Sequence, residues 1–174
     1  MLTSRYKEVW AEKRDSLMDA PGKLELYLSF KDNFGKESYL ELNNYRNKNA
    51  ITKMRISAHS LPIETGRYTG TPREERLCPL CKTGIGNELH YLLDCPNPKL
   101  VSARNAIIEQ IGCAYPEFHT LNKDRQVRFI LNGEDRDKVK YAGTLCAKIL
   151  KVFKDELKSI ETPVNSESMD SVSA

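Results

Sequence analysis

The sequence predicts an all-α domain with a metal-binding element embedded near its middle. Apolar residues recur at helical spacing through much of the chain, as at Val139, Ala142, Cys146, Ile149 and Phe153. The segment 78–95, CPLCKTGIGNELHYLLDC, carries three cysteines and one histidine in the order Cys-x2-Cys-x8-His-x4-Cys. Together these observations predict a helical fold in which a short irregular turn plus a helix holds a Cys3His site.

Length and composition indicate one domain with attachments. The chain has 174 residues, of which 40% are hydrophobic and 29% charged, with a net charge of +3. We divide it into an N-terminal helix (1–22), a helical domain (23–161) with the metal motif at 78–95, and a serine-rich tail (162–174) expected to be disordered. No apolar run approaches the roughly 18 residues of a membrane span, so no membrane partner is expected.

Cysteine usage and the N-terminus predict an intracellular location. The first ten residues, MLTSRYKEVW, contain no apolar signal region. Five cysteines, an odd number, suit a reducing compartment better than a disulfide framework. We therefore expect a nuclear or cytoplasmic protein, in which Cys113 and Cys146 are small buried hydrophobes.

The N-terminal third is expected to contain short helices. Residues 3–19 predict a helix with an inward side made of Tyr6, Val9, Trp10, Lys13 and Leu17. Residues 23–30, KLELYLSF, alternate as a strand would, but their residue types favour a helix, which is our prediction. A helix from Ser38 to about Tyr45 is expected to follow.

The middle and the C-terminal half alternate helices with breaks. Asn47 is expected to cap a helix over 50–60, which 61–63 breaks, and 64–76, ETGRYTGTPREER, is expected to be a polar loop. Further helices are predicted over about 99–111, 124–131 and 135–160.

The geometry of segment 78–95 explains how four ligands can meet. Two cysteines separated by two residues can turn back and present both sulfurs to one point. Gly84 and Gly86 are expected to let the chain reverse after this turn. Asn87 is a suitable N-cap for a short helix that reaches about Leu93.

The distal ligands need a break in that short helix. His90 and Cys95 are five residues apart, about 500° of α-helical rotation, so an unbroken helix would point them to different faces. Pro96 disfavours helical geometry at Cys95 and releases it toward the metal.

The expected cofactor is Zn²⁺, bound by Cys78, Cys81, His90 and Cys95. Four protein ligands make a closed, structural site without an open position for water. One alternative is that these are four unrelated buried residues. Another is a Cys-x-x-Cys redox pair, which would leave His90 and Cys95 without a role.

The run RISAHSLPIETGRYTGTPREERLCPLC (55–81), followed by IGNELHYLLDC (85–95), resembles the C-terminal segment of non-LTR (LINE-type, jockey-like) retrotransposon reverse transcriptases. The likeness spans roughly 24–111. In that family the segment lies beyond the polymerase thumb and carries a CCHC zinc-binding motif, whose ligand positions match the four residues above. Its middle spacer is longer than that of the retroviral nucleocapsid knuckle, so that knuckle's mode of recognition is not carried over.

A basic stretch with interleaved tyrosines precedes the cysteines. Its candidate nucleic-acid contacts are Arg55, Arg67, Tyr68, Arg73 and Arg76, because arginines beside an exposed aromatic ring suit phosphate contact and base stacking. The alternative is a solvated face with local ion pairs.

These observations predict a zinc-stabilised module that binds RNA or single-stranded DNA. No Tyr-x-Asp-Asp stretch is present to hold polymerase metal ions, so we expect no enzyme activity. Two alternatives remain, a zinc-stapled scaffold that binds protein partners and an element fragment without a function.

Overall fold

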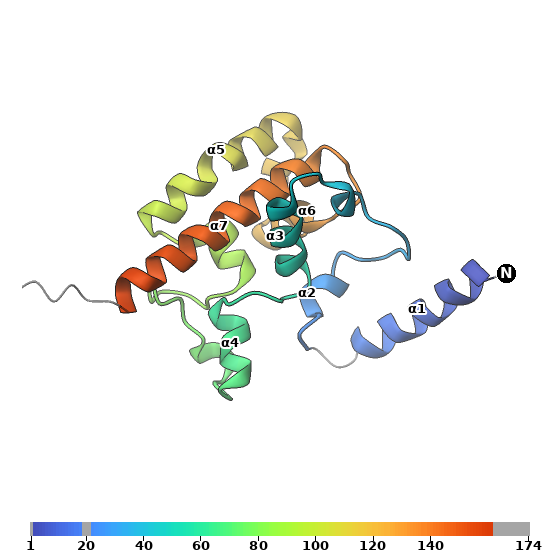
Figure 1. Cartoon of the computed structure of the whole chain (residues 1–174), viewed down its shortest axis with the longest axis horizontal. Helices are drawn as coiled ribbons and strands as arrows, with labels where there is room; N and C mark the ends of the chain where they lie inside the picture. The colour runs from blue at the N-terminus through green and yellow to red at the C-terminus, as the bar shows by residue number, and fades with distance from the viewer. Residues whose placement is uncertain (1, 19–21, 162–174) are drawn as a thin grey trace, which may run out of the picture.

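The structure is a computed structural model, and it describes residues 2–18 and 22–161. The expected tail, 162–174, lies outside these residues. The described chain is helical, and its only β-pairing is an isolated antiparallel bridge between Leu77 and Ile85. The all-α prediction is confirmed (Figure 1).

The α-helices are α1 (Leu2–Met18), α2 (Glu25–Leu28), α3 (Tyr45–Arg55), α4 (Pro62–Tyr68), α5 (Pro98–Ala114), α6 (Lys123–Leu131) and α7 (Lys138–Glu161). Shorter 3₁₀ turns are η1 (Ser38–Glu41), η2 (Arg73–Glu75) and η4 (Pro116–Thr120), and η3 (His90–Asp94) is a π-helical turn. None of the helices in the described ranges is long and apolar enough to cross a membrane.

The core surrounds α7, which crosses the middle of the molecule and packs against α3, α5 and α6 (Figure 1). The expected stripe on α7 is buried at Val139, Ala142, Leu145, Cys146, Ile149 and Phe153. Cys146 is a small buried hydrophobe as predicted, whereas Cys113 is exposed near the end of α5, contrary to prediction. The core therefore depends on one long helix whose apolar face receives three partners.

Arg55 is fully buried, with 0% of its surface exposed, at the end of α3. Its guanidinium lies over the rings of Phe30 and Tyr39, with both centroids at 4.7 Å. It also donates hydrogen bonds to the carboxylate of Glu37 and to the backbone carbonyl of Leu131. Arg55 thus ties the segment 30–39 to α3 and α6, and its assignment to an exposed nucleic-acid face is wrong.

Helix α1 lies at the edge of the molecule and contacts α2 (Figure 1). Its expected inward side is largely exposed, since Tyr6 is 61% exposed and Val9 and Leu17 are also on the surface. Trp10 is half-buried, and its ring centroid lies 6.4 Å from that of Phe34. The helical spacing was correct, but most of the stripe meets no partner in the part of the chain that the structure describes.

Two helix starts differ from the sequence-based prediction. The helix expected from Ser38 to Tyr45 is instead the turn η1, and α3 begins at Tyr45 because the side chain of Asn44 accepts a hydrogen bond from the backbone N–H of Asn47 at 3.1 Å. Pro62 begins α4 where a break was expected, since a proline at the first helical position loses no hydrogen bond. Part of the expected polar loop 64–76 is therefore helical.

Candidate metal centre

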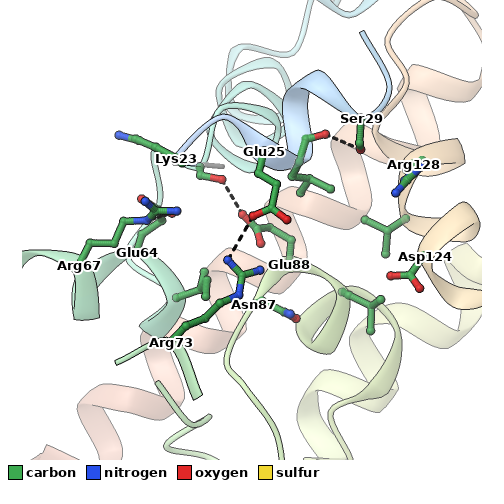
Figure 2. A pocket seen from close by; sticks show the side chains of 16 residues that line it. Lys23, Glu25, Ser29, Glu64, Arg67, Arg73, Asn87, Glu88, Asp124 and Arg128 are labelled. Carbon is green, nitrogen blue, oxygen red and sulfur yellow. Dashed lines mark hydrogen bonds and ion pairs between the residues drawn. The ribbon is translucent and has the colours of Figure 1, made fainter. Parts of the chain in front are cut away.

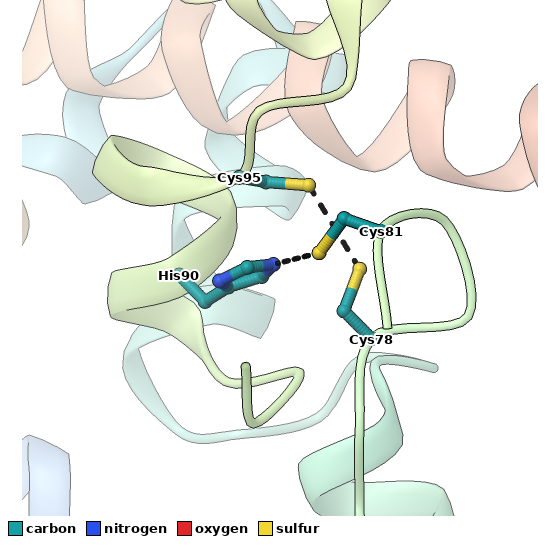
Figure 3. Close-up of side chains that lie close together, drawn as sticks. All are labelled: Cys78, Cys81, His90 and Cys95. Carbon is teal, nitrogen blue, oxygen red and sulfur yellow. Dashed lines mark hydrogen bonds between the residues drawn. The ribbon is translucent and has the colours of Figure 1, made fainter. Parts of the chain in front are cut away.

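A tight turn presents the first two cysteines. The N–H of Cys78 donates to the carbonyl of Gly84 at 2.8 Å, and the N–H of Lys82 donates to the carbonyl of Cys78 at 2.8 Å. Lys82 closes the turn in the left-handed region, with φ of 58°. The β-bridge between Leu77 and Ile85 fixes the base of this turn, so the sulfurs of Cys78 and Cys81 face the same side (Figure 3).

The two glycines of the segment have a different role from the one expected. Neither Gly84 nor Gly86 adopts a positive φ. A Cβ on Gly84 would lie 3.1 Å from Nδ1 of His90, and one on Gly86 would lie 2.7 Å from Cγ of Pro62. A Cβ at Gly86 would thus clash with Pro62, whereas one at Gly84 would need only a small shift of His90, and Lys82 makes the reversal.

The π-helical turn η3 aligns the other two ligands. Asn87 caps the segment as predicted, since its side chain accepts from the N–H of His90 at 2.9 Å. The N–H of Cys95 donates to the carbonyl of His90, five residues earlier, at 2.6 Å. Cys95 itself leaves helical geometry, with φ of −54° and ψ of 123°. The wider π turn thus assists the proline-induced break in bringing Cys95 and His90 to one side.

The four predicted ligands meet at one point (Figure 3). Their sulfur and nitrogen atoms all lie within 4.8 Å of one another. The sulfurs of Cys78 and Cys95 are 3.8 Å apart, and the sulfur of Cys81 lies 3.3 Å from Nε2 of His90. Cys78, His90 and Cys95 are buried, and Cys81 is half-buried. The cluster can hold a metal ion.

The surroundings shift the pKa values of the cluster in different directions: the shifts of His90 and Cys81 favour the forms that bind a metal, and the shift of Cys95 opposes binding. Burial, together with the positive charge of Arg104, lowers the pKa of His90 although Asp94 opposes the shift, so its imidazole is neutral and has a free lone pair. Burial and the neighbouring Cys78 raise the pKa of Cys95 to about 12. Burial also opposes ionisation of Cys81, but hydrogen bonds from Thr83 lower its pKa. A bound cation would stabilise the thiolates and release their protons.

Two buried polar atoms next to the cluster, the hydroxyl oxygen of Tyr91 and Nη1 of Arg104, make no hydrogen bond within the described residues. Burial and the adjacent Cys78 raise the pKa of the Tyr91 hydroxyl, so it remains a donor beside that sulfur. Burial lowers the pKa of Arg104, while Cys95 and Asp94 oppose this shift. Sequence reasoning missed both. Arg104 could have been noticed, because it stands on the apolar stripe of α5 between Leu100 and Ile107.

A buried polar network joins the metal segment (residues 77–95) to residues 57–59, which follow α3. Oε1 of Glu88 accepts from the hydroxyl of Ser57 at 2.7 Å and lies 2.9 Å from Nε2 of His59. Ser57 has a left-handed backbone, with φ of 49°. His59, whose side chain is buried, is therefore a hydrogen-bonding residue of this network.

Three of the five expected nucleic-acid contacts remain at the surface. Tyr68 is 80% exposed at the end of α4, and Arg73 is exposed, with Nη1 lying 3.3 Å from Glu25. Arg67 is half-buried and donates to Glu64 at 3.0 Å. Arg76 instead shapes the loop.

Arg76 is half-buried, and its side chain is occupied by backbone partners. It donates to the carbonyls of Thr71 at 2.8 Å and Ile63 at 2.9 Å. Its side chain also fills the space beside Gly66, where a Cβ would lie 2.6 Å from Cγ of Arg76. It therefore holds the end of α4 against the metal segment and is not part of the exposed face.

Comparison of the chain with protein-family models, with curated proteins and with solved structures finds no match. The resemblance to retrotransposon reverse transcriptases therefore stays a prediction of the sequence.

Proposed function

We propose that the metal centre binds one Zn²⁺ as a structural ion. A tetrahedron with Zn–S bonds of about 2.3 Å places two sulfurs about 3.8 Å apart. The sulfurs of Cys78 and Cys95 are separated by 3.8 Å. Three thiols and one imidazole are the ligand set that zinc prefers, and they fill all four positions. The ion would supply folding free energy, and no open position would remain for a reacting water.

We infer further that the chain is a nucleic-acid-binding module for RNA or single-stranded DNA, without catalysis of its own. The observation that carries this proposal is Tyr68, which is 80% exposed and stands in the sequence between Arg67 and Arg73. An exposed ring gives unpaired bases a stacking surface, while arginines neutralise phosphates. Of the five residues first expected at this face, only these three support the proposal.

Backbone hydrogen bonds connect the metal segment to α4, the helix that carries part of this face. The N–H of Ile63, in α4, donates to the carbonyl of Gly86 at 3.1 Å, and the N–H of Gly86 donates to the carbonyl of Arg76 at 2.8 Å. The helix that carries Tyr68 is therefore attached directly to the segment that holds the ligands. Loss of the metal is expected to weaken nucleic-acid binding by releasing α4.

The test is a salt titration of binding to single-stranded RNA and DNA oligonucleotides. Tyr68→Ala is expected to cost on the order of 1–3 kcal/mol of binding free energy through lost stacking. Arg73→Glu is expected to weaken binding to all sequences and to flatten the salt dependence. Tyr6→Ala and Arg5→Glu, exposed positions on α1, are matched controls that are expected to change neither quantity. Absence of binding by the metal-loaded protein at low salt would refute the proposal.

A second candidate function, a protein-interaction scaffold, is favoured by a separate observation. Tyr6, Val9 and Leu17 form an exposed apolar stripe on α1. Such a surface suits a protein partner better than a phosphate backbone. A protein that binds no oligonucleotide at low salt but loses a partner upon Tyr6→Ser would support this function instead.

A further inference from the structure

A cavity of about 180 Å³ lies beside the proposed nucleic-acid face, between α2, α4, residues 87–89 and α6 (Figure 2). Its volume is several times the roughly 30 Å³ that one water occupies in the liquid. Glu64 and Arg67 lie on one side, and Arg128 lies on the opposite side (Figure 2). The cavity can therefore admit a small organic group as well as water.

The cavity is lined by a buried carboxylate with an unused oxygen. Glu64 is only 2% exposed, and its Oε1 accepts the hydrogen bond from Nε of Arg67 at 3.0 Å. Oε2 is buried and has no hydrogen-bond partner among the residues that the structure describes. An unpaired buried carboxylate oxygen is costly, so this position favours a ligand that brings N–H donors.

The remaining lining divides into apolar walls and a charged mouth. Leu26, Ile63, Leu89 and Val127 contribute apolar surface, which suits the faces of a planar ring. The exposed Lys23 and Arg128 also line the cavity, and within the described ranges neither forms an ion pair. The carboxylates of Glu25 and Asp124 are also present, and Glu25 pairs with Arg73 at 3.3 Å. Lys23 and Arg128 can each contact an anionic group at the mouth. Asp124, which forms no ion pair within the described ranges either, and the buried Glu88 line the same cavity.

We propose that this cavity receives a guanine base from a bound single strand. This inference rests on the proposed nucleic-acid function and names the base that the module selects. The Watson–Crick edge of guanine carries two adjacent donors, N1–H and the 2-amino group, which match the acceptor capacity of Glu64. The ring lies between the apolar walls, and Lys23 and Arg128 contact the neighbouring phosphates.

The chemistry of the alternatives disfavours them. Adenine and cytosine each place a ring-nitrogen acceptor beside their amino group, and this lone pair would face the carboxylate. Uracil and thymine offer one N–H between two carbonyls. An arginine side chain of a partner protein would satisfy Glu64, but its charge would enter beside Lys23 and Arg128. Guanine combines two donors at one edge with a phosphate at the other end.

The test compares ten-nucleotide uridine strands carrying one central guanosine, inosine, adenosine or cytidine, bound to the zinc-loaded full chain at low salt. The guanosine strand is expected to bind about tenfold more tightly than the inosine strand, which lacks the 2-amino donor. Glu64→Gln is expected to abolish the preference for the guanosine strand over the inosine strand. Glu74→Gln, at an exposed glutamate outside the cavity, is the matched control.

The outcomes separate the two claims. Equal affinity for all strands, with a normal salt dependence, overturns guanine recognition and leaves the nucleic-acid function standing. No binding by any strand at low salt overturns both. Guanine recognition is also overturned if an arginine-rich peptide binds in a Glu64-dependent manner and the strands show no guanine preference. If Glu64→Gln loses zinc or its melting transition, the inosine comparison on the unmodified protein decides alone.

Discussion

The helical core and the metal segment keep their structure by different means. In the core, α3, α5 and α6 each bury an apolar face against α7, so the free energy of folding is spread over many contacts. In segment 77–95, regular structure is limited to one β-bridge and a short helical turn. Tyr91 and Leu92 of this segment are buried in the same apolar core, and the sulfurs and the imidazole converge next to it. The core should therefore lose stability gradually upon mutation, whereas the metal segment should fail as a unit.

Removing one ligand is expected to have the largest effect. Cys81→Ser or His90→Ala should abolish metal binding and unfold about residues 76–98, because binding free energy at such a site is folding free energy. Hydrogen-exchange mass spectrometry would show the loss of protection. Cys113→Ser, at an exposed cysteine, is the control and should keep both metal and protection. Retained protection in the ligand variants would show that packing alone holds the segment.

The two classes of arginine provide the next comparison. Arg55→Ala should lower the free energy of unfolding by about 3–5 kcal/mol, because it breaks the buried ion pair with Glu37 and removes the donor to the carbonyl of Leu131, although Lys31 still pairs with Glu37 at 3.3 Å. Arg73→Ala removes an exposed pair with Glu25 and should cost less than about 1 kcal/mol. Urea denaturation measures both. Similar costs for the two variants would contradict the burial of Arg55.

The network that joins the core to the metal segment should be sensitive to acid. Although burial opposes it, hydrogen bonds from His59 and Ser57 hold the pKa of Glu88 below its usual value. A carboxyl with a lowered folded-state pKa stabilises the protein above its unfolded pKa of about 4.3, and this contribution disappears as pH falls through the folded pKa.

Glu88→Gln should therefore destabilise the protein at pH 7, and the difference from the unmodified protein should shrink below about pH 4. Denaturation at several pH values measures this difference, in which acid release of metal from both proteins largely cancels. The exposed Glu74→Gln should show a pH-independent difference near zero. A constant penalty for Glu88→Gln at every pH would argue against an ionised Glu88.

The smallest effect is expected on α1, which lies outside both regions. Val9→Ser should change the free energy of unfolding by no more than about 0.5 kcal/mol, since Val9 is exposed. Ile149→Ala, on the buried face of α7, should cost about 2–5 kcal/mol. Thermal or urea unfolding compares them. A large cost for Val9→Ser would mean that α1 is covered by another surface in solution.

The convergence of the four candidate ligands could be predicted because it depends on local spacing in the sequence. Cys78 and Cys81 need only a short turn, and Pro96 marks where Cys95 leaves the helix. The helices of the core could be predicted equally well, because the apolar periodicity of α7 is regular over its length. Local pattern was sufficient wherever a residue's role depends on its near neighbours in the chain.

Long-range contacts account for the errors. Arg55 and Arg73 look alike in sequence, but rings from residues 30 and 39 cover only Arg55. The amphipathic stripe of α1 matches that of a buried helix, yet most of it meets no partner in the described part of the chain. In the sequence, Pro62 is equally compatible with a helix break and with the first position of a helix. The π turn at His90 was not foreseen, since its i to i+5 hydrogen bond has no residue signature.

The most direct test of the account is the metal content of the protein purified without added metal. Native mass spectrometry with elemental analysis should find one zinc per chain, and the Cys81→Ser variant should contain none. The same zinc-loaded sample should show strong amide protection over segment 77–95, which a chelator removes while the core helices stay protected. A metal-free chain in which segment 77–95 is already protected would contradict the claim that metal binding at the Cys3His cluster holds this segment together.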